Sequence, residues 1–133
     1  MLLDLDHTLG CGQVFRWRKE GGLWKGVVGG RMVVLEQDGP RVAVRSGMDM
    51  TEFERYFRMD DDLEAVYRAL GTDRYLSSCF ERYRGLRLVR QDPWECAASY
   101  VLATNANIPR IQGMVERVCR TFGTEMDGYY AFP

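Results

Sequence analysis

The chain has 133 residues, 46% of them hydrophobic and 12% aromatic, which is enough to bury the core of one domain, or of one domain and part of a second. A formal net charge of −1 argues against a protein that coats nucleic acid through charge alone. Four widely spaced cysteines and a single histidine argue against a zinc site and against a disulfide framework.

The first residues, LLDLDHTL at positions 2–9, have the outline of the D-x-D-x-T motif of haloacid dehalogenase phosphatases. In that motif the first aspartate, here Asp4, is the nucleophile and the second, Asp6, is the acid/base, with magnesium holding the pair. The chain then continues into short hairpins instead of alternating helices and parallel strands. A phosphatase is therefore the less favoured alternative.

The sequence Gly10-Cys11-Gly12-Gln13 predicts a flexible turn, followed by an alternating strand at 14–17. Glycine at position 12 would let the backbone come close to another molecule, because no Cβ intervenes. A plain turn without a binding role is the alternative, and the residues alone favour it.

Three further strands are predicted at 23–28, 31–37 and 41–45. They are separated by the turn signals EGG at 20–22, GG at 29–30 and DGP at 38–40. Connections this short force an antiparallel meander. One face of such a sheet must be covered, and the helices that follow can cover it.

Three amphipathic helices follow, and their apolar stripes predict that they cover the sheet. They begin at a capping box formed by Thr51-Glu52-Phe53-Glu54, at the acidic cluster 60–62, and at about Asp73. Residues 86–89 alternate again and predict a strand that returns to the same sheet. A sheet with segregated helices predicts a two-layer α+β domain over residues 1–90.

From residue 91 the sequence becomes helical. Asp92 is a good N-cap, Pro93 suits the first helical position, and Glu95 stands where a capping box has its acid. A second helix should turn six apolar side chains inward and stop at Gly123; they are Ile108, Ile111, Met114, Val115, Val118 and Phe122. These two helices cannot cover each other fully.

The two helices meet at a polar corner, Thr104-Asn105-Ala106-Asn107. Asn107 can cap the second helix, in which Pro109 lies in the first turn and costs no hydrogen bond. Asn105 is then at the tip of the corner, and Arg110 lies one turn into the second helix. A short corner between rigid helices can push one amide side chain into a neighbouring molecule, so it is the candidate functional centre.

Charge is distributed unevenly along the chain. Residues 49–64 carry seven acids and two arginines, whereas residues 74–120 carry eight arginines and four acids. Such polarity would let one face meet phosphates, although ordinary solvated helix faces explain it equally well.

The N-terminus lacks the features of a signal peptide, and no stretch approaches the about 20 apolar residues of a membrane span. We therefore expect reduced thiols, no membrane partner, and a location in the cytoplasm or nucleoid, or in a eukaryotic nucleus.

Over nearly all its length the chain resembles 8-oxoguanine DNA glycosylase, a base-excision repair family of the helix–hairpin–helix glycosylase superfamily. The blocks that carry the resemblance are GQVFRW at 12–17, GLRLVRQDPWEC at 85–96, NANIPR at 105–110 and GMVER at 113–117. The resemblance implies a twisted antiparallel sheet with helices on one face, similar to half a TATA-binding protein, over residues 1–90. Residues 91–133 would then form the first two helices of an all-α glycosylase domain. The complete enzyme would flip 8-oxoguanine out of duplex DNA and remove it by glycosylase and AP-lyase chemistry.

The resemblance also implies roles for three residues. The carbonyl of Gly12 would accept the hydrogen on N7 of 8-oxoguanine, where normal guanine has a lone pair and offers no donor. Asn105 would fill the space vacated by the flipped base and contact the orphaned cytosine, to which Arg110 would also bond. The implied partner is double-stranded DNA that contains 8-oxoguanine, with no cofactor and no metal.

The chain departs from the family pattern in the wedge and in the chemistry. Ala106 stands where the family often has another asparagine, and Pro109 replaces a small residue. The catalytic lysine and its assisting aspartate would belong to a part after Pro133, and neither Lys19 nor Lys25, beside glycine-rich turns, is placed to substitute. We expect no catalytic residue in this chain, no cleavage by it alone, and self-association through its uncovered helices. A non-catalytic module that binds nucleic acid or protein is the main alternative.

Overall fold

The computed structural model describes residues 2–133 and confirms the α+β class. Four strands form one antiparallel sheet in chain order; they are β1 Trp17–Glu20, β2 Leu23–Val28, β3 Arg31–Asp38 and β4 Arg41–Ser46. Each connection is a two-residue turn, and in the second one Gly29 and Gly30 have φ angles of 55° and 72°. The predicted meander is therefore confirmed from residue 23 onward. β1 begins later than predicted, because Val14 and Phe15 pack into two different cores before the first strand pair.

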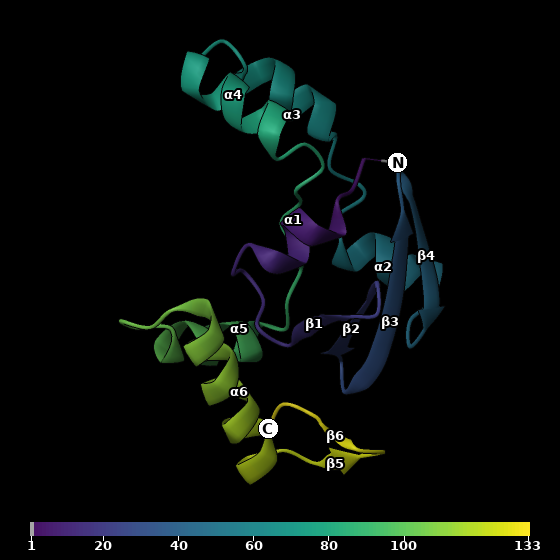
Figure 1. Cartoon of the computed structure of the whole chain (residues 1–133), viewed down its shortest axis with the longest axis vertical. Coiled ribbons are helices and arrows are strands. Elements are labelled where there is room, and N and C mark those ends of the chain that lie inside the picture. Colours follow the sequence, from purple (N-terminus) through teal and green to yellow (C-terminus); the bar gives the residue numbers. More distant parts are fainter. Residues whose placement is uncertain (1) are drawn as a thin grey trace.

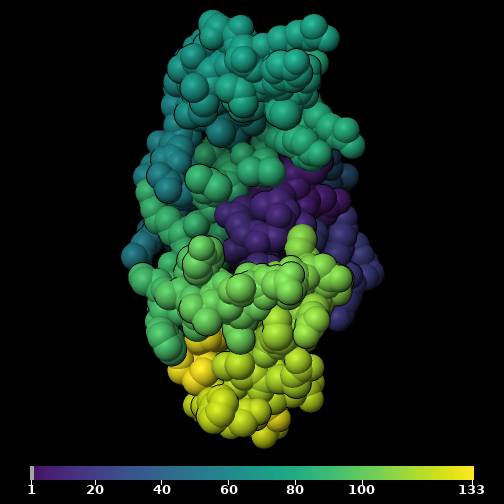
Figure 2. All heavy atoms as spheres, turned by 90° about the vertical axis from the view of Figure 1, so that its left-hand side faces the viewer, coloured from purple at the N-terminus to yellow at the C-terminus, as the bar shows by residue number. Residues whose placement is uncertain are grey.

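Six helices and a small hairpin complete the described chain (Figure 1). The helices are α1 Leu5–Gly10, α2 Met50–Tyr56, α3 Leu63–Leu70, α4 Arg74–Arg82, α5 Pro93–Leu102 and α6 Ile108–Phe122. The hairpin consists of β5 Glu125–Met126 and β6 Tyr129–Tyr130. In the space-filling view of Figure 2, α3 and α4 (teal) lie at one end of the molecule and α6 (yellow-green) at the other. Within residues 2–133, no helix combines the length and apolar character needed to cross a bilayer.

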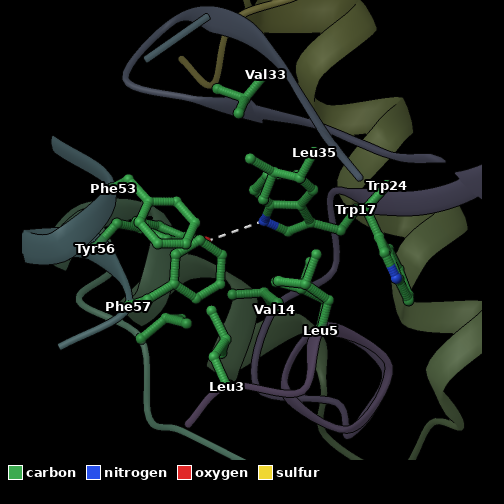
Figure 3. Close-up of a cluster of buried hydrophobic side chains, with 12 residues drawn as sticks. Leu3, Leu5, Val14, Trp17, Trp24, Val33, Leu35, Phe53, Tyr56 and Phe57 are labelled. Carbon is green, nitrogen blue, oxygen red and sulfur yellow. Dashed lines mark hydrogen bonds between the residues drawn. The ribbon is translucent and has the colours of Figure 1, made fainter. Parts of the chain in front are cut away.

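The main core lies between one face of the sheet and the helices α1 and α2 (Figure 3). The register of the strands places Trp17, Trp24, Val33 and Leu35 on that face. The helices contribute Leu5, Leu9, Phe53 and Tyr56, and Phe57 follows directly after α2; all five are buried. The indole N–H of Trp17 donates to the Tyr56 hydroxyl at 3.0 Å, so two polar atoms within the aromatic cluster satisfy each other. Burial raises the pKa of Tyr56 far above its ordinary value, which keeps that hydroxyl protonated.

The start of α2 differs from the predicted capping box. The cap is Asp49, not Thr51: the Asp49 carboxylate accepts from the Glu52 N–H at 2.8 Å, and the Asp49 N–H donates to the Glu52 carboxylate at 3.0 Å. The helix consequently starts at Met50. Two overlapping capping boxes were present, beginning two residues apart at Asp49 and Thr51, and the box with an acid at both ends formed and satisfied both orphan N–H groups.

Helices α3 and α4 do not cover the sheet, which corrects the sequence-based expectation. They form a separate helical hairpin, at the top of Figure 1, in which the rings of Tyr67 and Phe80 stack with centroids 4.8 Å apart. Neither helix has a buried residue, and Leu70 and Tyr75 are 47% and 77% exposed. Since α1 and α2 already occupy the sheet face, the apolar stripes of α3 and α4 pack mainly on each other.

Residues 86–89 are extended but do not join the sheet, so the predicted fifth strand is wrong. Side chains bind two of their N–H groups instead. The Arg87 N–H donates to the Thr8 hydroxyl at 3.1 Å, and the Val89 N–H donates to the Gln13 side-chain oxygen at 3.0 Å. Alternation reports that one face of an extended segment is buried, and it cannot tell a neighbouring strand from a neighbouring helix and turn.

A second, smaller core lies between α6 and the C-terminal hairpin. Its buried residues are Ile111, Val115 and Cys119, and the side chains of Phe15, Tyr130 and Phe132 pack against them. The predicted inward face of α6 is only partly right. Phe122 is 72% exposed, because the row of residues four apart that faces the hairpin continues through Cys119.

The sheet core generates a stability prediction at Gly26. A Cβ at this position would lie 2.3 Å from Cδ2 of the buried Trp17 ring. We expect Gly26→Ala to lower the free energy of unfolding by about 1–3 kcal/mol through overpacking, as measured by urea denaturation followed by tryptophan fluorescence. Gly10→Ala is the matched control, since a Cβ there meets nothing within 4 Å, and its effect should stay within about 0.5 kcal/mol. Equal effects of the two substitutions would contradict this packing.

Candidate nucleic-acid interface

The corner between α5 and α6 is built from two capped helix starts. The Asp92 carboxylate accepts from the Glu95 N–H at 2.9 Å, and Pro93 at the first helical position needs no partner. The Asn107 side-chain oxygen accepts from the Arg110 N–H at 3.0 Å. Both predicted caps are confirmed, and together they define where each helix starts.

The capping box predicted at Glu95 is only half formed. The Glu95 carboxylate lies 3.7 Å from the guanidinium of Arg16, whose side chain is 8% exposed. Arg16 also donates to the Tyr130 carbonyl, so it joins the segment before β1 to both α5 and β6. Burial raises the pKa of Glu95, and the nearby Arg16 charge opposes that shift. This pair fixes how α5 sits against the sheet domain.

Asn105 lies at the tip of the corner, as predicted, and it is exposed. Its φ of 53° is in the left-handed region, which asparagine tolerates better than most residues. Its side chain makes no hydrogen bond to any residue in the described range 2–133. Ala106 is half-buried and packs on the second core, while the Asn107 side chain is used as a cap. Asn105 therefore presents the one amide at this corner that projects without a partner among residues 2–133.

Arg110 lies in the first turn of α6, three residues after the Asn107 cap. Its backbone N–H is capped by Asn107, but its guanidinium is exposed and makes no ion pair with the part of the chain that the structure describes. Arg117 lies seven residues further along α6, on the same face, and is exposed and unpaired within residues 2–133 in the same way. The outer face of α6 thus carries two cations available to an external anion.

Gly12 lies against this corner. Its φ of 88° is in the region that favours glycine, and a Cβ there would lie 3.0 Å from Cδ1 of Ile108. Ile108 is the first residue of α6, so the contact holds the Gly12 turn beside the corner. Figure 2 shows the purple N-terminal segment adjoining the light-green start of α6 on one face. The structure therefore brings the Gly12 turn to the start of α6, the point of the chain that lies between Asn105 and Arg110.

Two glutamines that sequence analysis left without a role hold the Gly12 turn in place. The Gln13 side chain donates to the carbonyls of Thr8 and Arg87 at 2.8 Å each and accepts from the Val89 N–H at 3.0 Å. The Gln91 side chain donates to the Gln13 carbonyl at 2.7 Å. The signal in the sequence is faint: each glutamine adjoins an extended apolar stretch, where a lone amide can bind backbone groups.

The aspartates of the phosphatase-like motif have structural roles. Asp4 caps α1 by accepting from the His7 N–H at 2.7 Å, and the residues of the motif that follow Asp4 are helical. Asp6 accepts from Lys19 at 2.6 Å and from the Trp24 indole at 2.8 Å. The bond from Lys19 lowers the pKa of Asp6, so this carboxyl holds no proton to give to a leaving group near neutral pH.

Comparison with known families decides what kind of domain this is. The model of the 8-oxoguanine DNA glycosylase N-terminal domain matches residues 2–97. The chain belongs to this family. Among curated relatives, it is 32% identical over 88 residues to an N-glycosylase/DNA lyase of Saccharomyces cerevisiae, a match that covers 62% of this chain and 23% of the yeast protein. It is 29% identical over 126 residues to the N-glycosylase/DNA lyase OGG1 of Arabidopsis thaliana, covering 87% of this chain and 34% of that protein.

Solved structures of 8-oxoguanine glycosylases share the fold of this family member. MBOgg1 in complex with a low-affinity DNA ligand superposes with a TM-score of 0.89 at 31% identity, over 98% of this chain and 48% of that one. The Clostridium acetobutylicum 8-oxoguanine glycosylase/lyase, bound to duplex DNA with cytosine opposite 8-oxoguanine, gives a TM-score of 0.89 at 28% identity. That match covers 98% of this chain and 48% of the other. The chain thus spans about half the length of the solved relatives, and less of the curated ones.

The left-handed backbone at Asn105 generates a prediction for this glycosylase-family corner. Asn105→Gly should keep the free energy of unfolding within about 0.5 kcal/mol of that of the unmodified chain, because glycine adopts this conformation freely. Asn105→Ala should lower it by about 1–2 kcal/mol, because a Cβ without a compensating polar group strains the left-handed region. Urea denaturation of the two variants measures the difference. If alanine proves as stable as glycine, the corner does not hold Asn105 in this conformation.

Proposed function

We propose that this chain is the lesion-recognition part of a base-excision repair enzyme that removes 8-oxoguanine from duplex DNA. The single observation that carries the proposal is the contact between Gly12 and Ile108, since it places a free backbone turn beside the corner that bears Asn105 and Arg110. Family membership supplies the chemical context. The proposed partner, double-stranded DNA containing 8-oxoguanine, is supported by the DNA complexes of the structural relatives.

Gly12 is proposed to sense the lesion. No residue in the range 2–133 donates a hydrogen bond to its carbonyl oxygen, so this acceptor is available to an external donor. 8-Oxoguanine carries a hydrogen on N7 that the carbonyl can accept, whereas guanine presents a lone pair there and repels it. One backbone oxygen can thus discriminate between two purines that differ little in shape. When guanine is bound, the Gly12 carbonyl oxygen and guanine N7 are both acceptors, and neither finds a donor.

Asn105 and Arg110 are proposed to hold open the duplex after the damaged base has left the stack. Extruding a base loses its pairing and stacking, at a cost of a few kcal/mol that a wedge can offset. The exposed amide of Asn105 has both donors and an acceptor for the edge of the orphaned cytosine. The exposed guanidinium of Arg110 can donate to the same base.

The bond-breaking groups are proposed to come from outside residues 1–133. Lys19 is bonded to Asp6 at 2.6 Å and Lys25 to Glu20 at 2.9 Å, so both lysines of the chain are paired with carboxylates, one on α1 and one on β1. Neither is presented at the corner as a nucleophile for a sugar carbon.

We further propose that residues 91–133 begin a helical glycosylase domain, which the separate core of α6 supports. We also propose that the exposed side chains of Tyr100 and Val101 favour self-association when no other part of the protein covers them.

The test of the proposed function is lesion preference. We expect the chain to bind a duplex with 8-oxoguanine opposite cytosine about tenfold more tightly than the same duplex with guanine, the ratio that one hydrogen bond of about 1.4 kcal/mol gives. Fluorescence anisotropy at fixed salt measures both affinities, because the phosphate contribution is common to the two duplexes. Equal affinities would instead support a plain nucleic-acid-binding module.

Arg110 generates a prediction about the base opposite the lesion. Arg110→Ala should reduce the preference for cytosine over adenine opposite 8-oxoguanine by about 1–3 kcal/mol, measured by the same anisotropy assay on the two duplexes. Arg117→Ala is the matched control, because it removes an exposed, unpaired cation from the same helix face. It should weaken binding to all duplexes alike. An unchanged cytosine preference in Arg110→Ala would rule out its contact with the opposite base.

A further inference from the structure

We propose that Gln13, supported by Gln91, is a positioning residue that keeps the Gly12 carbonyl aimed at the lesion and prevents the Gly12–Gln13 peptide from flipping. This inference rests on the proposed function of Gly12. It assigns specificity to two glutamines that need not touch the base themselves.

The Gln13 carboxamide is saturated with backbone partners. Both of its N–H donors are used, one by the Thr8 carbonyl at the end of α1 and one by the Arg87 carbonyl, at 2.8 Å each. Its oxygen accepts from the Val89 N–H at 3.0 Å. The side chain therefore bridges α1 to the extended 86–89 segment, and it can leave neither without orphaning buried backbone groups.

The main chain of Gln13 is held from a second side. The Gln91 side chain donates to the Gln13 carbonyl at 2.7 Å. In contrast, neither group of the peptide that joins Gly12 to Gln13 is bonded within residues 2–133: the Gly12 carbonyl accepts nothing there and the Gln13 N–H donates to nothing. The orientation of this peptide is therefore set by the anchors on either side of it, which are Gln13 itself and the Ile108 side chain against Gly12.

Glycine makes this orientation vulnerable. The peptide unit is planar, with its C=O and N–H pointing in opposite directions, so a rotation of the whole unit exchanges the two groups. Such a rotation changes ψ of Gly12 and φ of Gln13, and the Gly12 side does not resist it because glycine has no Cβ. After the flip, the Gln13 N–H would face N7 of the purine in place of the Gly12 carbonyl. A donor at that point matches the lone pair of undamaged guanine, so the flip would reverse the preference for the lesion.

The test compares three glutamine variants in the anisotropy assay, with duplexes that carry 8-oxoguanine, guanine or an abasic-site analogue opposite cytosine. Gln13→Met removes three side chain–backbone hydrogen bonds and should lower the 8-oxoguanine to guanine affinity ratio about tenfold. Gln91→Met removes one bond and should lower the ratio about threefold. Both should bind the abasic duplex as the unmodified chain does, because that duplex has no purine to read.

Gln37→Met is the matched control. The Gln37 side chain also makes three bonds to backbone, to Leu5, Leu3 and Gly39, on the side of α1 away from Gly12. Its loss should leave the affinity ratio unchanged despite a similar loss of stability. Equal falls in Gln13→Met and Gln37→Met, or a full ratio in Gln13→Met, would overturn the positioning role.

The remaining outcomes are also decisive. If Gln13→Met does not fold, Gln91→Met alone decides, and an unchanged ratio in that variant overturns the proposal. If the unmodified chain shows no preference for 8-oxoguanine over guanine, the proposed function itself is overturned. If the unmodified chain has that preference and Gln13→Met keeps it, only the positioning role of Gln13 is overturned. A parallel loss on all three duplexes, abasic included, would show a structural role only and would overturn the inference.

Discussion

The packing of Gly12 against Ile108 is the constraint on which the rest of the arrangement depends. It joins a turn that precedes the sheet to the first residue of α6, which lies about a hundred positions further along the chain. Any side chain at position 12 would meet Ile108 and would also strain the backbone at a φ of 88°. The buried Arg16, between Glu95 and the Tyr130 carbonyl, ties the same two regions together a few residues later. The relative position of the sheet domain and the corner is therefore fixed by close contacts at two points.

The features that could be predicted from the sequence are those decided by residues close together in the chain. Glycine pairs at 21–22 and 29–30 set two-residue turns, and the caps at Asp62, Asp73 and Asn107 each depend on groups three residues away at most. The predictions were wrong where the structure of a segment depends on residues that are distant in the chain. Residues 86–89 alternate like a strand, but the Thr8 and Gln13 side chains accept from the Arg87 and Val89 N–H groups, and no local pattern encodes these distant partners.

The candidate site follows the same division. The corner that bears Asn105 and Arg110 was predicted from its helix caps, and the roles of Gly12, Asn105 and Arg110 came from the family resemblance. What could not be predicted was that Ile108 would bring the glycine turn to that corner, since this contact depends on how α6 crosses the N-terminal segment. The glutamines were missed because an amide in an apolar stretch has no periodicity to mark it, and its value lies entirely in the backbone groups that folding places around it.

Recognition by this chain would rely on groups that need no activation. A backbone carbonyl, an amide and a guanidinium hold the same charge and the same hydrogen-bonding capacity across the physiological pH range. Nucleophilic chemistry is different, because an attacking amine must lose its proton in a shielded site. Lys19 and Lys25, each about 40–50% exposed and bonded to a carboxylate, lack that shielding. Separating the two tasks between different parts of an enzyme allows the sensing part to be rigid.

The hairpin of α3 and α4 has a consequence for the dynamics of the chain. Its helices have no buried residue, and the Tyr67 and Phe80 rings pack between them, while Arg84, just after α4, pairs with Glu64 of α3. Segments with so few buried apolar contacts open with a free energy well below that of global unfolding, as a separate cooperative unit. The amide hydrogens of α3 and α4 would exchange with solvent while the sheet core stays closed. The free energy of opening would therefore be lower for this hairpin than for the sheet core of the same chain.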